Sequence, residues 1–216
     1  MLKKIITIID YDIGNLYSVV NAIHKCGFQA KVTNDINEIL SAESLILPGV
    51  GAFRNGISNL NRKNLVVAIK KYVAQGKPLL GICLGMQLLA KQSLEFGIHK
   101  GLDIIDGTVI PLSNHVKLGQ NIKIPNIGWT ELEKTKYSNW DNSIFNDLRT
   151  SDQVYLIHSY YFNPSNNKYV LANGDFNGKK ICIAIKKGNV YGTQFHPEKS
   201  GEVGLRVLRN FCNLQN

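Results

Sequence analysis

The residues Gly81-Ile82-Cys83-Leu84-Gly85-Met86-Gln87 place a single cysteine between glycines, where one apolar run ends and another begins. Residues 77–82 predict a short buried strand, and residues 85–91 predict the start of a helix with one apolar face. Such a turn exposes a catalytic side chain, because small neighbours relieve crowding and the helix offers free backbone N–H groups. The segment therefore predicts a nucleophile at Cys83, against the plainer reading of a small buried thiol.

A second segment, Val190-Tyr191-Gly192-Thr193-Gln194-Phe195-His196-Pro197-Glu198, has the pattern of a strand that ends in a histidine and a carboxylate. His196 can accept the proton of Cys83. Glu198 follows two positions later, on the same side of an extended chain, and can hold the imidazole tautomer. A lone histidine near a strand end is more often structural. The two segments together nevertheless indicate a Cys, His, Glu triad that only folding can unite.

Strand and helix signals alternate in the first half of the chain, which favours a parallel sheet with crossover helices. Strands are expected at residues 5–9, 29–33, 44–47 and 77–82. Helices are expected at residues 16–25 and 65–74, and Gly27 and Gly76 are their expected stop signals. Beyond about residue 105, shorter β-type runs predict a mixed or antiparallel extension of the sheet. These runs are 121–124, 154–158, 169–172 and 181–186; residues 137–146 read as a polar surface loop, and 201–212 as a closing helix.

Length and composition are those of an ordinary globular chain. The 216 residues suffice for one domain, 1–216, with a sizeable core, and no apolar run approaches the ~20 residues that span a bilayer. The start Met1-Leu2-Lys3-Lys4 leads into a strand pattern and lacks the features of a cleavable signal. The four cysteines are scattered, without metal-ligand spacing, so we expect reduced thiols, a cytoplasmic location, and neither metal nor cofactor.

The formal net charge of +9 raises the alternative of a nucleic-acid-binding protein. The basic residues are dispersed, however, and none belongs to a recognisable nucleic-acid motif. They include the pairs Lys3-Lys4, Lys70-Lys71, Lys179-Lys180 and Lys186-Lys187. Solvated lysine-rich faces are the plainer explanation, so we expect no nucleic-acid partner and only some bias toward a negatively charged partner or substrate.

Together, the cysteine turn and Gln194-Phe195-His196-Pro197-Glu198 resemble the class I (triad) glutamine amidotransferases. Within them, the chain is similar from end to end to the glutaminase subunits of imidazole glycerol phosphate synthases. The further motifs that carry this similarity are Asp10-Tyr11-Asp12-Ile13-Gly14-Asn15-Leu16, Pro48-Gly49-Val50-Gly51-Ala52-Phe53, Pro125-Asn126-Ile127-Gly128-Trp129 and His158-Ser159-Tyr160-Tyr161. Two departures are Asp12-Ile13, where relatives commonly have small residues, and Gly101-Leu102-Asp103, which replaces Gly-Leu-Gly.

The resemblance implies a three-layer, flavodoxin-like α/β fold around a central mixed, mostly parallel sheet. It implies hydrolysis of L-glutamine to glutamate and ammonia, through a thioester, by the catalytic residues Cys83, His196 and Glu198. The turn at residues 48–51 would then supply an oxyanion donor, so that the backbone N–H of Val50 or Gly51 acts with that of Leu84. Without the resemblance, this segment is an ordinary tight turn.

By the same resemblance, the residues that hold the substrate are Gln87, His158, Ser159 and Tyr160. Gln87 follows Cys83 by one turn of the predicted helix, so its amide would lie beside the bound glutamine. Residues 158–160 would run their backbone along the α-amino and carboxylate groups of the substrate. The plainer readings are a polar surface residue at Gln87 and an edge strand with an aromatic face at residues 158–161.

Ammonia made by this chemistry has to reach an acceptor, yet neither a G-x-G-x-x-G nor a Walker A phosphate-binding pattern occurs in the chain. The resemblance implies a heterodimer with a (βα)8-barrel cyclase subunit of L-histidine biosynthesis, which adds the ammonia to a phosphorylated ribulosyl aminoimidazole nucleotide. Asn15 and Trp129 are the expected interface residues near the ammonia exit. Core packing is the alternative for Trp129.

Two other functions stay open. Paralogous glutaminases supply ammonia to a sugar amidotransferase in surface-polysaccharide biosynthesis, and Ser93-Leu94-Glu95-Phe96-Gly97 is similar to those relatives. A binding or scaffold protein that keeps the fold without the activity is the other, and the intact triad argues against it. Families of this type gate the oxyanion turn on association, so we expect low activity without the partner.

Overall fold

The computed structural model describes residues 4–115 and 122–214. In this part of the chain, seven strands form a central sheet in the order β11 (Val170–Phe176), β12 (Lys179–Lys187), β13 (Val190–Thr193), β4 (Leu79–Ile82), β3 (Leu45–Leu47), β1 (Ile5–Ile9) and β2 (Gln29–Thr33). The strands from β13 to β2 run parallel, whereas β12 and β11 continue the sheet in antiparallel pairing. The predicted mixed, mostly parallel sheet is confirmed.

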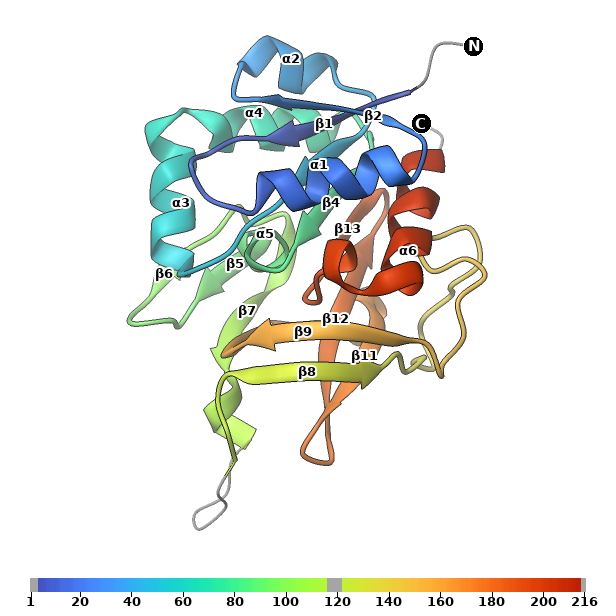
Figure 1. Ribbon diagram of the computed structural model, residues 1–216. Helices are drawn as coiled ribbons and strands as arrows, with labels where there is room; N and C mark the ends of the chain where they lie inside the picture. The colour runs from blue at the N-terminus through green and yellow to red at the C-terminus, as the bar shows by residue number, and fades with distance from the viewer. Residues whose placement is uncertain (1–3, 116–121, 215–216) are drawn as a thin grey trace.

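Helices cover both faces of this sheet, which gives the fold three layers (Figure 1). One face carries α1 (Leu16–Lys25) and α6 (Gly201–Asn213), and the other carries α2 (Ile36–Ser41), α3 (Phe53–Arg62) and α4 (Leu65–Ala74). Side chains alternate along β1, so that Ile6 and Ile8 pack with α1 and α6 while Ile9 packs on the opposite side. Of the helices among the described residues, none is both long and apolar enough to cross a membrane.

The chain leaves the central sheet after α5 (Leu84–Leu88) and builds a smaller sheet beside it. Its strand order is β10 (Tyr160–Pro164), β7 (Ile105–Pro111), β5 (Ala90–Ser93) and β6 (His99–Lys100). A separate antiparallel pair, β8 (Asn126–Glu131) with β9 (Gln153–His158), crosses in front of β11 and β12 in the lower half of Figure 1. Short 3-10 turns are η1 (Leu112–His115), η2 (Asn167–Tyr169) and η3 (Pro197–Lys199).

The helix ends follow the local chemistry of the sequence. The Asn15 side chain accepts a hydrogen bond from Ser18 N at 3.4 Å and so caps the start of α1. Gly27 and Gly76, just past α1 and α4, have φ of +91° and +76°, which glycine adopts without steric cost. The predicted stops of both helices are confirmed.

The helix expected over residues 85–91 is wrong in length. It ends at Leu88, and Ala90–Ser93 is strand β5 instead. The carbonyl of Leu88 accepts a hydrogen bond from Leu102 N at 2.8 Å, and that of Leu89 accepts one from Ile104 N at 3.0 Å. These long-range bonds take the acceptors that a longer helix would need for its own ladder.

Two further expectations are corrected. Residue 121 lies outside the described residues, and the described residues 122–124 are not a strand; β8 begins at Asn126, after Pro125, which has no N–H to give to a ladder. Residues 137–146 do lack regular structure, but Trp140 and Phe145 are buried in the core, and the Trp140 indole donates to Leu171 O at 2.8 Å. Helices α2 and α3 were not anticipated from the sequence.

Candidate active site

Cys83 stands where β4 turns sharply into α5. Its φ of +53° is left-handed, a conformation that a non-glycine residue keeps only when its surroundings impose it. The N–H of Cys83 donates to Thr193 O at 2.7 Å, and its carbonyl accepts from Gln87 N at 3.2 Å. Gly85 allows the close approach of α5 to β3, since a Cβ there would lie 1.8 Å from Leu47 O. The predicted strand-turn-helix therefore presents the thiol at the carboxyl edge of the central sheet.

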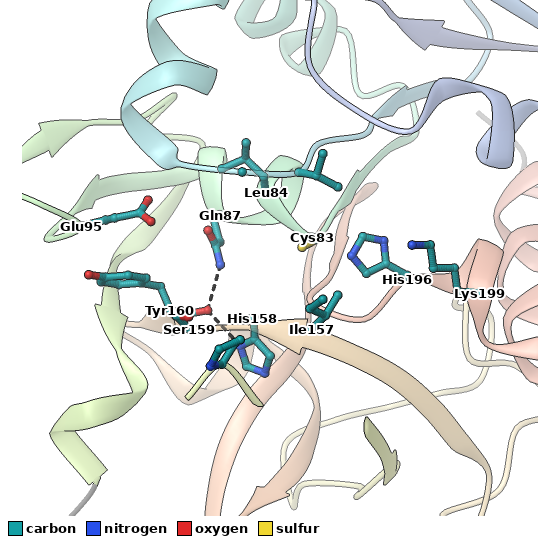
Figure 2. A pocket seen from close by; sticks show the side chains of 13 residues that line it. Cys83, Leu84, Gln87, Glu95, Ile157, His158, Ser159, Tyr160, His196 and Lys199 are labelled. Atoms are coloured by element: carbon teal, nitrogen blue, oxygen red, sulfur yellow. Dashed lines mark hydrogen bonds between the residues drawn. The ribbon is translucent and has the colours of Figure 1, made fainter. Parts of the chain in front are cut away.

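His196 and Glu198 form a buried pair beside that thiol. His196 Nδ1 donates to Glu198 Oε1 at 2.8 Å, and both side chains are almost fully buried. Figure 2 shows the imidazole next to the Cys83 sulfur. Nε2 of His196 has no hydrogen-bond partner within the described chain, so it is available to the thiol. Burial opposes the charge of His196, but contacts with Cys83 and Glu198 outweigh burial and raise its pKa.

The pairing of His196 with Glu198 arises from a different backbone than expected. Residues 197–199 form the 3-10 turn η3 and not an extended chain. Pro197 begins the turn, and Lys199 N donates to His196 O at 3.0 Å, which closes it. The turn brings the carboxylate back onto the ring.

The sulfur and the imidazole open into one pocket of about 380 Å³. Its walls come from the turn at residues 48–51, the start of α5, the β5–β6 loop, the end of β9 and η3, as Figure 2 shows for the labelled side chains. The residues that line it are Val50, Gly51, Cys83, Leu84, Gln87, Glu95, Pro125, Ile157, His158, Ser159, Tyr160, His196 and Lys199. The structure thus brings the expected catalytic triad, oxyanion and substrate-binding residues together around one cavity, with Glu198 behind His196.

Gln87 is tied into the pocket wall by its amide nitrogen. Nε2 of Gln87 donates to Tyr160 O at 2.9 Å and to Gln194 Oε1 at 3.0 Å, so its Oε1 remains for another partner. His158 Nδ1 donates to the same Tyr160 carbonyl at 2.9 Å, and Asn126 Nδ2 donates to His158 Nε2 at 3.3 Å. Burial lowers the pKa of His158 to about 4, so this ring is neutral at pH 7.

The turn expected to hold the oxyanion is closed onto α5. Leu84 N–H, one of the expected donors, gives its hydrogen to Gly49 O at 3.3 Å. The Tyr11 hydroxyl donates to Pro48 O at 2.6 Å and fixes the start of the turn. Gly51 has φ of +91° with open space around it, and Val50 is 41% exposed.

Glu95 and Gln194, to which no role was assigned from the sequence, also belong to the site. Glu95 lines the pocket, is largely buried, and accepts from Phe53 N at 2.6 Å through Oε2. Gln194 is fully buried and donates to Cys83 Sγ at 3.6 Å. A carboxylate between Leu94 and Phe96 was the available signal for Glu95. Gln194 stands two residues before the His-Pro-Glu motif, but no spacing rule predicts its contact with the sulfur.

The two expected interface residues are both on the surface. Trp129 is 56% exposed on β8, so the alternative of core packing is wrong for this chain. The centroids of the Trp129 and Tyr155 rings are 5.8 Å apart, in an edge-to-face arrangement. Asn15 is exposed at the start of α1. Neither residue lines the pocket.

A family model described as "Glutamine amidotransferase class-I" matches residues 7–214. The chain is 44% identical over 210 residues to "Imidazole glycerol phosphate synthase subunit HisH 1" of Legionella pneumophila (strain Paris), covering 97% of this chain and 99% of that protein. It is 43% identical over 210 residues to "Imidazole glycerol phosphate synthase subunit HisH" of Syntrophotalea carbinolica, covering 97% of this chain and 100% of that protein.

Solved structures show the same fold. One described as a glutamine amidotransferase superposes with a TM-score of 0.71 at 19% identity, over 96% of this chain and 97% of that chain. A structure described as PurLQS from Thermotoga maritima superposes with a TM-score of 0.69 at 22% identity, over 98% of both chains.

Proposed function

Because this chain belongs to the class-I glutamine amidotransferases, we propose that it is the glutaminase subunit of an imidazole glycerol phosphate synthase. It hydrolyses L-glutamine to glutamate and passes the ammonia to a cyclase subunit in L-histidine biosynthesis. The observation that carries the proposal is the strained Cys83 beside the His196–Glu198 pair in one pocket. The cysteines of the described chain are free, which fits a reducing compartment, and we place the enzyme in the cytoplasm.

The reaction begins with attack of the Cys83 thiolate on the side-chain amide carbon of glutamine. The raised pKa of His196 keeps a proton on the imidazole, and Nε2 delivers it to the departing nitrogen as ammonia leaves. A water molecule then attacks the thioester while neutral His196 takes up its proton. Glutamate is released and the thiolate is restored. Glu198 holds Nδ1–H throughout and so keeps Nε2 aimed at the reacting atoms.

The tetrahedral intermediate needs N–H donors, and the turn at residues 48–51 controls them. In the present conformation Leu84 N–H donates its hydrogen bond to Gly49 O. This carbonyl must therefore move away before Leu84 N–H can donate to the oxyanion. The same movement would turn an N–H of Val50 or Gly51 into the pocket. We assign this movement to binding of the partner, which explains why the chain alone should be a poor glutaminase.

Charge complementarity orients the substrate. Glu95 supplies a carboxylate in the pocket wall, so we place the α-ammonium group of glutamine against it. The neutral His158 avoids repelling that group. Gln87 Oε1, which accepts no hydrogen bond from the described residues, accepts one from the substrate side-chain amide. The backbone of Ser159 and Tyr160 borders the α-carboxylate.

The surface for the partner lies on the β8–β9 pair. Ile127, Trp129 and Ile157 are exposed by 56%, 56% and 40%, and Ile127 pairs directly with Ile157 across the two strands. Ile157 also lines the pocket, so this apolar face reaches the site of ammonia release. An exposed aromatic and aliphatic face of this kind suits a stable protein partner. We propose that a (βα)8-barrel cyclase covers it in a heterodimer, with Asn15 at the edge.

The test is to purify the chain with the protein that it binds in its host and to measure glutamate and ammonia release with and without that partner. We expect low release from the chain alone, a large increase with a barrel cyclase, and no release from Cys83→Ala in either state. Near-normal turnover by Cys83→Ala would refute the mechanism. Recovery of an ATP-using sugar amidotransferase as the activating partner would refute the histidine-pathway assignment while leaving the glutaminase chemistry intact.

A further inference from the structure

Gln194 is a fully buried amide against the nucleophile, and the mechanism above gives it no role. It directly follows β13, where its backbone N–H donates to Ile183 O at 2.8 Å. Its Nε2 lies 3.6 Å from Cys83 Sγ, and its Oε1 accepts from Gln87 Nε2 at 3.0 Å. We propose, building on the function above, that Gln194 is a positioning residue: its amide N–H holds the Cys83 sulfur, as the thiolate, in the attacking position.

The orientation of the Gln194 amide follows from its neighbours. Gln87 Nε2 has two hydrogens, and it gives one to Tyr160 O at 2.9 Å and the other to Gln194 Oε1. A reversed Gln194 amide would set two NH2 groups against each other. His158 Nδ1 also donates to Tyr160 O, at 2.9 Å, which anchors the far end of this chain of hydrogen bonds. The nitrogen of Gln194 must therefore face Cys83, where sulfur is the acceptor.

An N–H directed at sulfur favours the charged state, because hydrogen bonds to ionised acceptors are stronger than those to neutral ones. Because Gln194 is buried and does not line the pocket, its N–H restrains the sulfur from behind the pocket wall. The other titratable groups that influence the sulfur in the described chain are His196 and Tyr11. Neither residue takes part in the Gln87–Gln194 hydrogen bond, and both remain when Gln194 is replaced.

Alkylation of Cys83 by iodoacetamide tests the inference on the chain alone, without glutamine or a partner. Gln194→Glu keeps an acceptor for Gln87 but presents no N–H to the sulfur, and Gln194→Met removes both groups without adding charge. Peptide mass spectrometry measures the rate of alkylation at Cys83 from about pH 5 to about pH 10. We expect both variants to react about tenfold more slowly at neutral pH and to approach the parent as the pH rises, because alkaline solution favours the Cys83 thiolate with or without the Gln194 N–H.

Gln92→Glu is the matched control. Gln92 lies on β5 and contacts Thr108 Oγ1 at 3.4 Å, so the variant makes the same change of charge away from the sulfur, and its alkylation profile should equal that of the parent. Circular dichroism establishes that each variant is folded, and if Gln194→Met does not fold, Gln194→Glu decides.

An unchanged alkylation profile in the folded Gln194 variants overturns the inference, whatever their glutaminase activity. In the partner-activated assay, the supporting result is a lower kcat with an unchanged KM. If the parent complex releases no ammonia but the alkylation profile shifts as expected, the proposed function fails and the contact between Gln194 and Cys83 stands.

Discussion

At the scale of single residues, the two buried histidines of the site take opposite charge states. Burial works against the charge of His196, but Cys83 and Glu198 outweigh it and raise the pKa. For His158, burial dominates and lowers the pKa to about 4, although the Tyr160 carbonyl acts the other way. One ring can therefore hand over a proton at neutral pH while the other stays neutral beside the substrate.

This difference is directly observable by NMR of the 15N-labelled histidine rings. At about pH 6, below the ordinary histidine pKa of about 6.5, we expect His196 to be an imidazolium and His158 to be neutral with its proton on Nδ1. Single His→Gln variants assign the signals. A neutral His196 at this pH would contradict the thiolate–imidazolium pair on which the mechanism depends.

Replacing the triad carboxylate should cost stability in a pH-dependent way. The pKa of His196 is raised on folding, so its stabilisation is complete below about pH 6.5 and is lost as the pH rises through the higher folded value. Glu198→Gln removes a charge-assisted hydrogen bond, so we expect a loss of about 2 kcal/mol in the free energy of unfolding at about pH 6 and a smaller loss at about pH 10. Urea unfolding at the two pH values measures both.

Glu202→Gln is the matched control for that experiment. Its carboxylate is 69% exposed and 3.7 Å from Arg209, so its removal should change the unfolding free energy by less than about 1 kcal/mol at either pH. A Glu198→Gln cost that stays constant with pH would show that His196 does not carry the extra charge.

Local sequence patterns identified candidate residues that the structure brings together. Cys83 between glycines and His196 two positions before Glu198 are visible as patterns, and the structure places all three together. Glu95 and Gln194 were assigned no role, because only tertiary folding turns their side chains toward the pocket and the sulfur. Their roles, like those of the other site residues, stay predictions until variants are measured.

At the scale of elements, the close contact between β4, α5 and β3 shapes the nucleophile turn. A Cβ on Gly81 would lie 2.7 Å from the Gly85 backbone, and one on Gly85 would lie 1.8 Å from Leu47 O. Both collisions are with main chain, which cannot yield as a flexible side chain can. Small residues are therefore required here by packing as well as by the turn.

Gly85→Ala should destabilise the protein by more than about 3 kcal/mol, because α5 must move away from β3. Gly178→Ala, in the β11–β12 turn, provides the comparison. Gly178 has φ of +74° with nothing within reach of an added Cβ, so the cost there is conformational only, about 1–2 kcal/mol. Chemical unfolding of both variants measures the difference, and equal losses would contradict the described packing.

Elements were predictable where periodicity agreed with a terminal signal. Helices α1 and α4 combine an apolar face with a glycine stop, and their bounds match the prediction. For residues 85–91, apolar composition alone predicted a helix that is too long, because Ala90–Ser93 forms a strand that pairs with β7. For residues 137–146, polar composition predicted a surface loop, but the few apolar side chains of this segment are buried in the core.

At the scale of the whole molecule, the exposed β8–β9 face is the surface that we propose for assembly. We expect Trp129→Ala to weaken binding of the cyclase partner by about tenfold or more, since an aromatic residue at the centre of an apolar interface commonly dominates the binding energy. Isothermal titration calorimetry of the purified pair gives the dissociation constant. Activity at saturating partner should be retained to a large extent, because Trp129 does not line the pocket.

Val67→Ala is the control for an exposed apolar residue elsewhere. Val67 is 59% exposed on α4, which lies at the opposite end of the molecule from β8 in Figure 1. The Val67→Ala variant should bind the cyclase partner with the same dissociation constant as the parent. Equal affinity for Trp129→Ala and the parent would exclude the β8–β9 face as the docking surface.

The hydrogen bond from Leu84 N–H to Gly49 O has a consequence for the living cell. If this bond opens only when the partner binds, as we propose, newly synthesised copies that have not yet met their partner should hydrolyse little glutamine and release little ammonia. Unequal expression of the two subunits would then cost the cell little glutamine, since surplus copies of this protein would be nearly inactive.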